Sequence, residues 1–224
     1  LGSGVLDMAQ VWQHPLATVT SWVREVRGWE HVEAAHAAGK GLLILAPHLG
    51  CWELAGIYYG SRRPVTALYR PPRQAWLHRL MKSGRERNGI RTVPPGRSGV
   101  RALLGALKRN EAAFILPDQV ANTGEGAWVP FFGQPTYMPI LPYRLLASTG
   151  ATALLFFCER LSWGRGFRLH IVPLPNLSAA PEAAAARVNA AVEDLIRAHP
   201  TQYLWSYRIF RRQPEMTPAP GANA

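Results

Sequence analysis

The segment that most constrains this chain is Gly41–Glu53, with the sequence GLLILAPHLGCWE. An apolar run from Leu42 to Ala46 stops at a proline, and His48 follows directly. A short, continuously apolar run bounded by turn residues predicts a strand that is buried on both faces, as in parallel sheets. Open α/β sheets place their chemistry at the carboxyl ends of the strands. We therefore expect His48 at such an end, positioned to act.

Glu53 is the nearest carboxylate to His48 in the sequence, five positions later. Each residue of a helix turns by about 100°, so residues five apart on one helix point about 140° away from each other. His48 and Glu53 can meet only if His48 lies in the loop and Glu53 lies in the first turn of the next helix, with Gly50 allowing the turn. Glu53 would then orient one imidazole nitrogen and leave the other as a general base. The alternative is a histidine that caps a strand end and an unrelated surface glutamate.

Two further residues near these positions are candidates for chemistry. Asp118 follows a second buried run, Ala112–Leu116, and shares the edge with His48 if the two strands are neighbours. It could orient an arginine or a substrate hydroxyl, or cap a loop. Cys51 is expected at a helix N-terminus, where a thiol can become a nucleophile. A small core residue is the better interpretation of Cys51, and Cys158 is predicted to lie in the core.

Strands and helices alternate through most of the chain, which predicts an α/β fold with a mainly parallel sheet flanked by helices. We expect a single domain over residues 1–212, followed by a Pro/Ala tail at 213–224 with little reason to order. Strands are predicted at 42–46, 65–69, 90–93, 112–116, 151–159 and 167–173, and helices at 7–38, 51–59, 74–88, 98–109, 141–149 and 181–199. Residues 120–138 are predicted to form a long loop, whose apolar centre at 128–132 argues against disorder.

Positive charge is concentrated in one stretch of the sequence. Residues 62–109 contain thirteen Arg or Lys and one acid, Glu86, so they carry +12 while the rest of the chain sums to −1. We expect one face or groove to hold this charge and to attract phosphorylated or acidic partners. Only Tyr69 and Trp76 are available in this stretch to stack on bases, so an anionic lipid or an acidic carrier protein is favoured over nucleic acid.

Several classes of protein are excluded or disfavoured by absent patterns. The sequence has no GxSxG elbow, no P-loop and no GxGxxG motif, which argues against a serine hydrolase and against nucleotide binding. Two cysteines make no disulfide framework, and no Cys/His group has zinc spacing, so we expect no metal. No apolar run approaches the roughly 18–20 residues of a membrane span.

The motifs together resemble the lysophospholipid acyltransferase superfamily. His48 to Glu53 matches its H-x4-D/E motif, and the remaining matches point to the late acyltransferases of lipid A synthesis, the lauroyl and myristoyl transferases. These matches are Tyr69-Arg-Pro, Arg85, Asp118-Gln119, Val129-Pro-Phe-Phe-Gly133, and Gln202-Tyr-Leu-Trp205 with Arg208 and Phe210. Phosphatidylinositol-mannoside acyltransferases look similar. Many family members carry a histidine where Tyr207 stands, so no role is assigned to Tyr207.

The resemblance implies a lysophospholipid-acyltransferase-like fold and a reaction. A fatty acyl chain would move from acyl carrier protein, or from acyl-CoA, to a hydroxyl of a lipid A precursor, without a bound cofactor. His48 would deprotonate the hydroxyl and Glu53 would hold His48. Arg70 and Arg85 would bind substrate phosphates, and Asp118 matches the acid of the D-Q turn.

The expected partners are acyl carrier protein, a phosphorylated glycolipid acceptor and an anionic membrane surface. The resemblance implies a place at the cytoplasmic face of the bacterial inner membrane. Family members usually begin with a membrane helix, so we expect peripheral attachment or an anchoring segment upstream of Leu1. Two other hypotheses stay open at this point. One is a thioesterase or lipid hydrolase that uses His48 with Cys51 or water, and the other is a non-enzymatic membrane-binding module.

Overall fold

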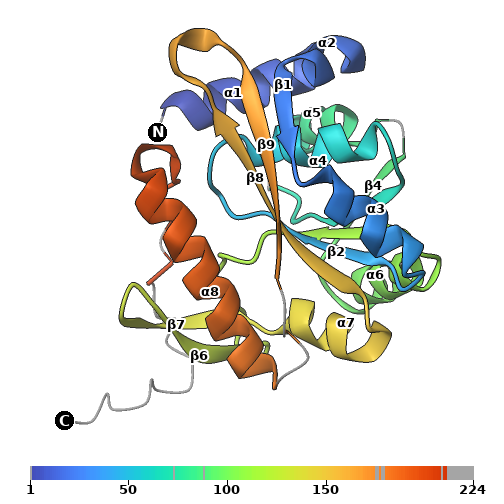
Figure 1. Cartoon of the computed structure of the whole chain (residues 1–224), viewed down its shortest axis with the longest axis vertical. Coiled ribbons are helices and arrows are strands. Elements are labelled where there is room, and N and C mark those ends of the chain that lie inside the picture. Colours follow the sequence, from blue (N-terminus) through green and yellow to red (C-terminus); the bar gives the residue numbers. More distant parts are fainter. Residues whose placement is uncertain are drawn as a thin grey trace.

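The computed structural model describes residues 2–72, 74–87, 89–174, 177, 180–207, 209 and 210, with side chains from Asp7 onward. Its centre is a seven-stranded sheet (Figure 1). In order across the sheet, the strands are β1 (Val23–Arg27), β9 (Phe167–Pro173), β8 (Thr152–Arg160), β2 (Leu42–Leu45), β5 (Ala112–Ile115), β3 (Val65–Leu68) and β4 (Ile90–Val93). The five strands from β8 to β4 are parallel, and β9 and β1 run the other way. The predicted α/β fold with a mainly parallel sheet is confirmed.

Strands β2 and β5 lie side by side at the middle of the sheet. All four residues of each strand are buried, which explains why their sequences are apolar without alternation. Leu42 pairs with Ala112 and Leu45 with Ile115 in parallel register. Their carboxyl ends therefore emerge at the same place. We call the side of the sheet where the five parallel strands end the carboxyl edge, and the opposite side the amino edge.

Helices cover both faces of the sheet and enclose two separate apolar cores. One face carries α1 (Gly2–Gln13), α2 (Leu16–Ser21), α3 (Trp29–Ala37), α4 (Trp52–Gly60) and α5 (Ala75–Arg85). The other face carries α6 (Arg97–Lys108), α7 (Leu141–Thr149) and α8 (Pro181–Ala198). Short 3₁₀ turns occupy Ser162–Gly164 and Pro200–Gln202. None of the described helices is long and apolar enough to cross a bilayer.

Two predictions of local structure were wrong. Val23–Arg27 is a strand that pairs with β9, although the apolar spacing of residues 7–38 predicted helices throughout. Residues 120–138 contain a β-hairpin, β6 (Gly126–Phe131) and β7 (Gln134–Pro139), that packs against α8. Its two turn residues, Phe132 and Gly133, both have positive φ, as a tight hairpin turn requires. The usual Asn-Gly signal is missing there, and prolines in both strands also disguise the hairpin.

The strands predicted at 151–159 and 167–173 are present as β8 and β9, and they form a hairpin whose turn extends beyond the carboxyl edge. The predicted Pro/Ala tail at 213–224 and the motif residue Arg208 lie outside the described residues.

Candidate active site

The loop that follows β2 is held in place by the C-terminal part of the chain. The His48 carbonyl accepts a hydrogen bond from the Leu204 N–H, at 3.0 Å. Gly50 bridges to Cys158 at the end of β8 and has a φ of 63°. A Cβ atom at Gly50 would lie 2.1 Å from the Cys158 carbonyl oxygen, so only glycine fits this turn. The prediction that Gly50 permits the turn between His48 and α4 is consistent with this geometry.

Asp118 is the residue that binds His48. Asp118 lies just beyond β5, and its Oδ1 is 2.9 Å from the His48 Nδ1. Its Oδ2 accepts the backbone N–H of His48, also at 2.9 Å. One buried carboxylate therefore fixes both the ring and the main chain of the histidine. Because β2 and β5 are neighbours, the expectation that His48 and Asp118 share an edge is met, and the contact between them is closer than the sequence indicated.

Aromatic rings enclose the His48 imidazole. Tyr207 stacks on it with ring centroids 5.4 Å apart and an interplanar angle of 9°, and Trp52 meets it edge-on at 5.0 Å. The histidine is 8% exposed. Its Nε2 makes no hydrogen bond to any residue that the structure describes. With Nδ1 bound to a carboxylate, Nε2 is the nitrogen that can accept a proton from a substrate.

Glu53 has a different partner, and the predicted contact with His48 is not made. Its carboxylate accepts two hydrogen bonds from the Arg85 Nε, at 2.9 and 3.1 Å, and a further one from the Arg85 Nη2. The Trp12 indole N–H donates to it at 3.3 Å. Glu53 does lie in the first turn of α4, as predicted, but its side chain points to α1 and α5. The H-x4-E spacing thus places His48 and Glu53 at the same edge of the sheet, but no hydrogen bond joins their side chains.

Arg85 is a buried cation in contact with aromatic rings. Its guanidinium carbon lies 4.7 Å from the Tyr69 ring centroid and 5.6 Å from that of Trp12. Burial by itself would lower the pKa of Arg85, but the Glu53 carboxylate outweighs burial and raises that pKa above its ordinary value. Its Nη1 has no hydrogen-bond partner among the described residues. The Arg85 guanidinium therefore stays protonated inside the protein, its charge is balanced by Glu53, and its Nη1 keeps N–H groups without a partner among the described residues.

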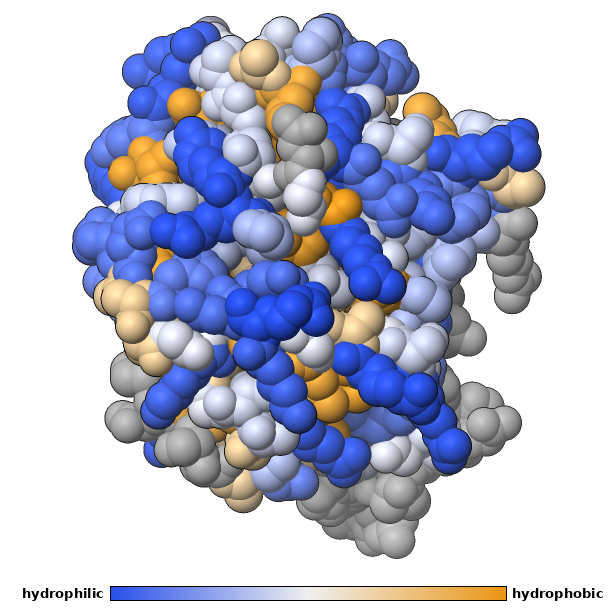
Figure 2. Space-filling view, turned by 90° about the vertical axis from the view of Figure 1, so that its right-hand side faces the viewer, coloured by the Kyte–Doolittle hydropathy of each residue, from blue (hydrophilic) through white to orange (hydrophobic). Residues whose placement is uncertain are grey.

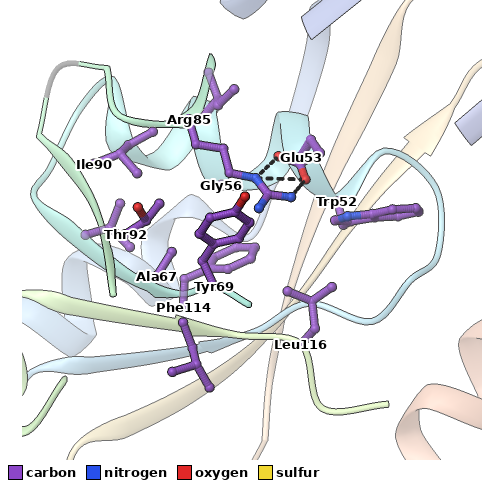
Figure 3. Close-up of a pocket in the computed structure, with 13 residues that line it drawn as sticks. Trp52, Glu53, Gly56, Ala67, Tyr69, Arg85, Ile90, Thr92, Phe114 and Leu116 are labelled. Carbon is purple, nitrogen blue, oxygen red and sulfur yellow. Dashed lines mark hydrogen bonds and ion pairs between the residues drawn. The ribbon is translucent and has the colours of Figure 1, made fainter. Parts of the chain in front are cut away.

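An apolar cavity lies directly beside the Glu53–Arg85 pair (Figure 3). Its walls come from α4, β3, β4 and β5, on the face of the sheet that α1 and α5 cover. The lining residues are Trp52, Glu53, Gly56, Ile57, Val65, Ala67, Leu68, Tyr69, Arg85, Ile90, Thr92, Phe114 and Leu116. Trp52 contacts both this cavity and the His48 ring. The Trp52 side chain thus lies between His48 and an apolar cavity that has one charged pair at its wall.

Residues 1–212 match the model of the bacterial lipid A biosynthesis acyltransferases. The chain belongs to this family.

Individual relatives agree with the family match. The lipid A biosynthesis palmitoleoyltransferase of Escherichia coli K12 is 29% identical over 216 residues, which is 96% of this chain and 70% of the relative. The lipid A biosynthesis lauroyltransferase of the same organism is 28% identical over 223 residues, covering 98% and 72%. A phosphatidylinositol mannoside acyltransferase of Mycobacterium tuberculosis H37Rv is 30% identical over 186 residues, covering 80% and 58%.

The two cysteines of this acyltransferase are poorly suited to act as nucleophiles. Cys51 is 2% exposed, and burial raises the pKa of its thiol to about 12. Burial also raises the pKa of Cys158. A thiol with so high a pKa is almost never a thiolate near neutrality. The structure therefore supports the core interpretation of both residues and argues against a route through Cys51.

Arg70 does not join the buried pairs of this acyltransferase. It lies in the exposed loop after β3, and its guanidinium donates to the Asn122 side chain at 3.2 Å. That bond ties the loop after β3 to the loop after β5, so Arg70 stays at the carboxyl edge. Its charge has no acidic partner among the described residues.

The basic stretch 62–109 is divided over the surface and does not form one groove. Arg63 binds Glu33 and Arg109 binds Glu111 at the amino edge, whereas Arg70 and Arg85 lie toward the carboxyl edge. Figure 2 shows the side with β4, α3 and α6, where hydrophilic side chains are spread across the face with apolar patches between them. The chain between residues 62 and 109 passes from one edge of the sheet to the other. Basic residues that are close in the sequence are therefore separated on the surface, and the predicted single positive face is not formed.

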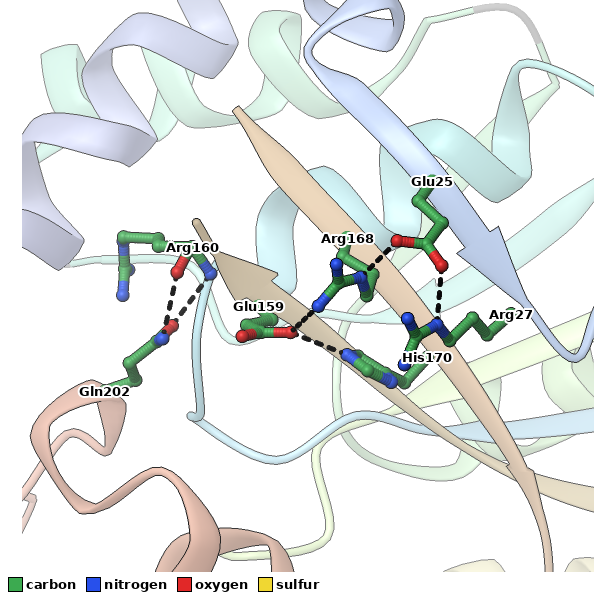
Figure 4. Close-up of polar contacts among 7 residues, drawn as sticks. All are labelled: Glu25, Arg27, Glu159, Arg160, Arg168, His170 and Gln202. Atoms are coloured by element: carbon green, nitrogen blue, oxygen red, sulfur yellow. Dashed lines mark hydrogen bonds and ion pairs between the residues drawn. The ribbon is translucent and has the colours of Figure 1, made fainter. Parts of the chain in front are cut away.

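Sequence reasoning left out several residues that shape the site. Trp52 and Trp12 gave no signal beyond their apolar character. Tyr207 was noted for its position but not assigned a role, and it stacks on His48. Arg160 donates to the Gly50 carbonyl at 2.8 Å, and its backbone exchanges two hydrogen bonds with the Gln202 side chain (Figure 4). Arg160 and Gln202 thereby brace the loop that carries His48. Only the match of Gln202 to the family motif drew attention to this residue.

Proposed function

We propose that this chain transfers a fatty acyl group from an acyl thioester to a hydroxyl of a phosphorylated glycolipid of the lipid A type. The observation that carries the proposal is the His48–Asp118 pair beside an apolar cavity with a buried cation at its wall. Family membership supports acyl transfer, and two relatives are named as lipid A acyltransferases.

His48 would act as the general base with Asp118 as its orienting residue. Asp118 holds the Nδ1 proton, so Nε2 takes the proton of the acceptor hydroxyl. The hydroxyl oxygen then forms a bond with the thioester carbonyl carbon, and the carbon–sulfur bond breaks. The leaving sulfur receives the proton back from His48. No covalent enzyme intermediate is needed, which agrees with the raised pKa of the buried Cys51 thiol.

The cavity would hold the acyl chain of the donor, because its lining is apolar apart from Glu53, Arg85, Tyr69 and Thr92. Trp52 connects the cavity with His48, so a thioester at its mouth would lie near the base. Arg85 has one N–H free to bind an oxygen of the substrate, and Glu53 would keep its guanidinium in place. Arg70, at the surface of the same edge, would attract phosphate groups of the acceptor or of the donor.

Acyl carrier protein is the donor carrier that we propose, with acyl-CoA as the alternative. An acidic carrier protein would be attracted to the positively charged chain, whose net charge is +11. The direct test is to incubate the protein with radiolabelled acyl-carrier-protein thioesters and a tetra-acylated, bis-phosphorylated lipid A precursor. The proposal predicts a more acylated lipid with the wild type and with Cys51→Ser, but not with His48→Gln or Asp118→Asn. Transfer by His48→Gln at the wild-type rate would contradict it.

A mannosylated lipid is the second candidate acceptor, because a phosphatidylinositol mannoside acyltransferase is 30% identical to this chain. Running both acceptors side by side with the same thioester separates the two candidates. Release of free fatty acid without any acylated lipid would instead favour a thioesterase, which the same assay detects.

A further inference from the structure

Most of the large apolar side chains that are strongly exposed to solvent lie toward one edge of the molecule. Among the described residues, the strongly exposed ones are Trp76 (63%), Trp163 (95%), Val172 (40%), Trp205 (57%) and Phe210 (50%). Trp76 is the second residue of α5, the helix that follows the carboxyl end of β3. Trp163 lies in the turn beyond the carboxyl end of β8. We call Trp76, Trp163, Trp205 and Phe210 the edge aromatics. Val172 pairs with Leu155 near the start of β8, away from that edge.

The edge aromatics surround the loop that carries His48. Trp205 follows Leu204, whose N–H donates to the His48 carbonyl. The hairpin with Trp163 is joined to the same loop through Arg160, which donates to the Gly50 carbonyl. Helix α1 links Arg160 to α5, because Asp7 binds Arg160 and Trp12 packs on Gly84 of α5. The segments that carry Trp76, Trp163 and Trp205 are therefore connected, directly or through α1, to the loop that carries His48.

Trp163 is the most prominent of the four. It has a φ of 62°, and Gly164 after it has a φ of 65°. Two successive residues with positive φ are the positions where tight turns favour Asn and Gly. A tryptophan is disfavoured in this conformation, and at 95% exposure it gains almost nothing from packing. Neither the turn nor the core explains why this side chain is a tryptophan.

Cations without acidic partners accompany the exposed tryptophans. Arg165 lies two residues after Trp163 and donates its Nε to a backbone carbonyl. Arg24 lies against Gly166 of the same turn, and Arg79 is one helical turn from Trp76 on α5. The structure gives these three arginines no ion pair with any described carboxylate. The edge is therefore both aromatic and positively charged.

We infer that the carboxyl edge docks on the interface of a lipid bilayer that contains anionic lipid. Tryptophan favours the boundary between headgroups and acyl chains, and arginines beside it are attracted to lipid phosphates. In this orientation a lipid acceptor would reach His48 without leaving the membrane surface. This last consequence rests on the proposed function, whereas the docking itself does not.

The test is co-sedimentation with vesicles of phosphatidylcholine that contain about one-quarter phosphatidylglycerol, free of donor and acceptor. We expect Trp163→Ser and Trp76→Ser each to weaken binding on the order of tenfold, because each removes a large apolar side chain from the interface. Val172→Ser is the matched control and should bind like the wild type. Arg24→Gln should weaken binding about fivefold, whereas Lys108→Gln at the amino edge should leave it unchanged.

Three results would overturn the docking. They are no binding of the wild type to the anionic vesicles, unchanged binding by both tryptophan variants, and equal loss by Val172→Ser. Thermal unfolding of each variant checks that a loss of binding is not a loss of folding. Acyl transfer to detergent-dispersed acceptor is measured in parallel. Transfer without vesicle binding would reject the docking alone, and vesicle binding without transfer would reject the proposed function alone.

Discussion

Two histidine–carboxylate pairs of similar length lie among the described residues, and only one of them is at the end of parallel strands, where we propose the catalytic site. His48 Nδ1 is 2.9 Å from Asp118 Oδ1, and His170 Nε2 is 2.8 Å from Glu159 Oε2. His48 and Asp118 come from loops at the ends of two parallel strands. His170 and Glu159 instead lie within β9 and β8, on facing strands of a hairpin (Figure 4).

The surroundings of the two pairs differ as much as their positions. Asp118 gives both oxygens to His48, one to the ring and one to the main chain. Glu159 is shared with Arg168, which also binds Glu25, so it belongs to a structural network across β1, β8 and β9. A histidine beside a carboxylate is therefore not a site in itself. The strand end, the carboxylate that binds both the ring and the main chain of the histidine, and the neighbouring cavity distinguish the His48 pair.

The largest expected effect comes from replacing the two histidines by the same residue. His48→Gln should lower the rate of acyl transfer by about 10³-fold or more, because general-base catalysis contributes about 10²–10⁴-fold and the ring also positions the acceptor. His170→Gln should retain the rate within about twofold, since it only disturbs a structural network. Initial rates with purified variants measure both. Equal losses in the two variants would remove the distinction between the pairs.

The next largest expected difference in turnover is between variants of the two carboxylates, Asp118 and Glu159. Asp118→Asn should lower the turnover number by on the order of 10³-fold, because an amide can stabilise the wrong imidazole tautomer and no longer balances a protonated ring. Glu159→Gln is the matched substitution and should leave the turnover number near the wild-type value. Separate measurement of kcat and KM is informative, because an Asp118 that only capped the loop would change KM and stability more than kcat.

The structure pairs Glu53 with Arg85, whereas the sequence motif favoured His48 as its partner. A variant of Glu53 tests which partner matters. Glu53→Gln should lower the free energy of unfolding by about 3 kcal/mol, because it leaves the buried Arg85 without a counter-charge. Chemical denaturation measures this loss. If Glu53 instead oriented His48 directly, the variant would lose activity with little change in stability.

The double variant Glu53→Gln/Arg85→Met provides the control for Glu53. It removes the charge together with its partner, so it should recover part of the lost stability. No recovery would show that Arg85 is not the residue that Glu53 neutralises.

The sequence predicted the position of the candidate site better than the contacts within it. Continuous apolar runs identify β2 and β5, so His48 and Asp118 could be placed at strand ends. Their contact depends on the order of strands in the sheet, which joins residues 70 apart and is not encoded in any local pattern. The five-residue spacing favoured Glu53 as the partner of His48, but Arg85, 32 residues away, binds it.

Unusual turn residues explain why the β6–β7 hairpin was not predicted from the sequence. The β6–β7 hairpin turns at Phe132 and Gly133, and Trp163 occupies a left-handed position in the β8–β9 turn. Aromatic residues at such positions contradict the propensities on which turn prediction relies. The two strands of the second hairpin could still be predicted from their apolar residues, whereas the prolines of the first hairpin concealed its strands.

The smallest expected effect concerns the pH dependence of stability at the His170–Glu159 pair. Burial alone would raise the pKa of Glu159, but the hydrogen bond from His170 and the nearby positive charges outweigh burial and lower that pKa. A carboxylate with a lowered folded-state pKa adds stability above its unfolded pKa, which is about 4.3 for Glu. That stability is lost as the pH falls through the folded-state value.

Glu159→Gln should therefore destabilise the protein by about 1 kcal/mol at neutral pH, since the pair is partly exposed. The difference from the wild type should shrink as the pH is lowered below about 4. Urea denaturation at a series of pH values, with the wild type measured at each pH, gives the difference. A difference that persisted at low pH would mean that Glu159 contributes by packing rather than by charge. The contrast between Glu159, which His170 and Arg168 share, and Asp118, whose two oxygens both bind His48, would then be weaker.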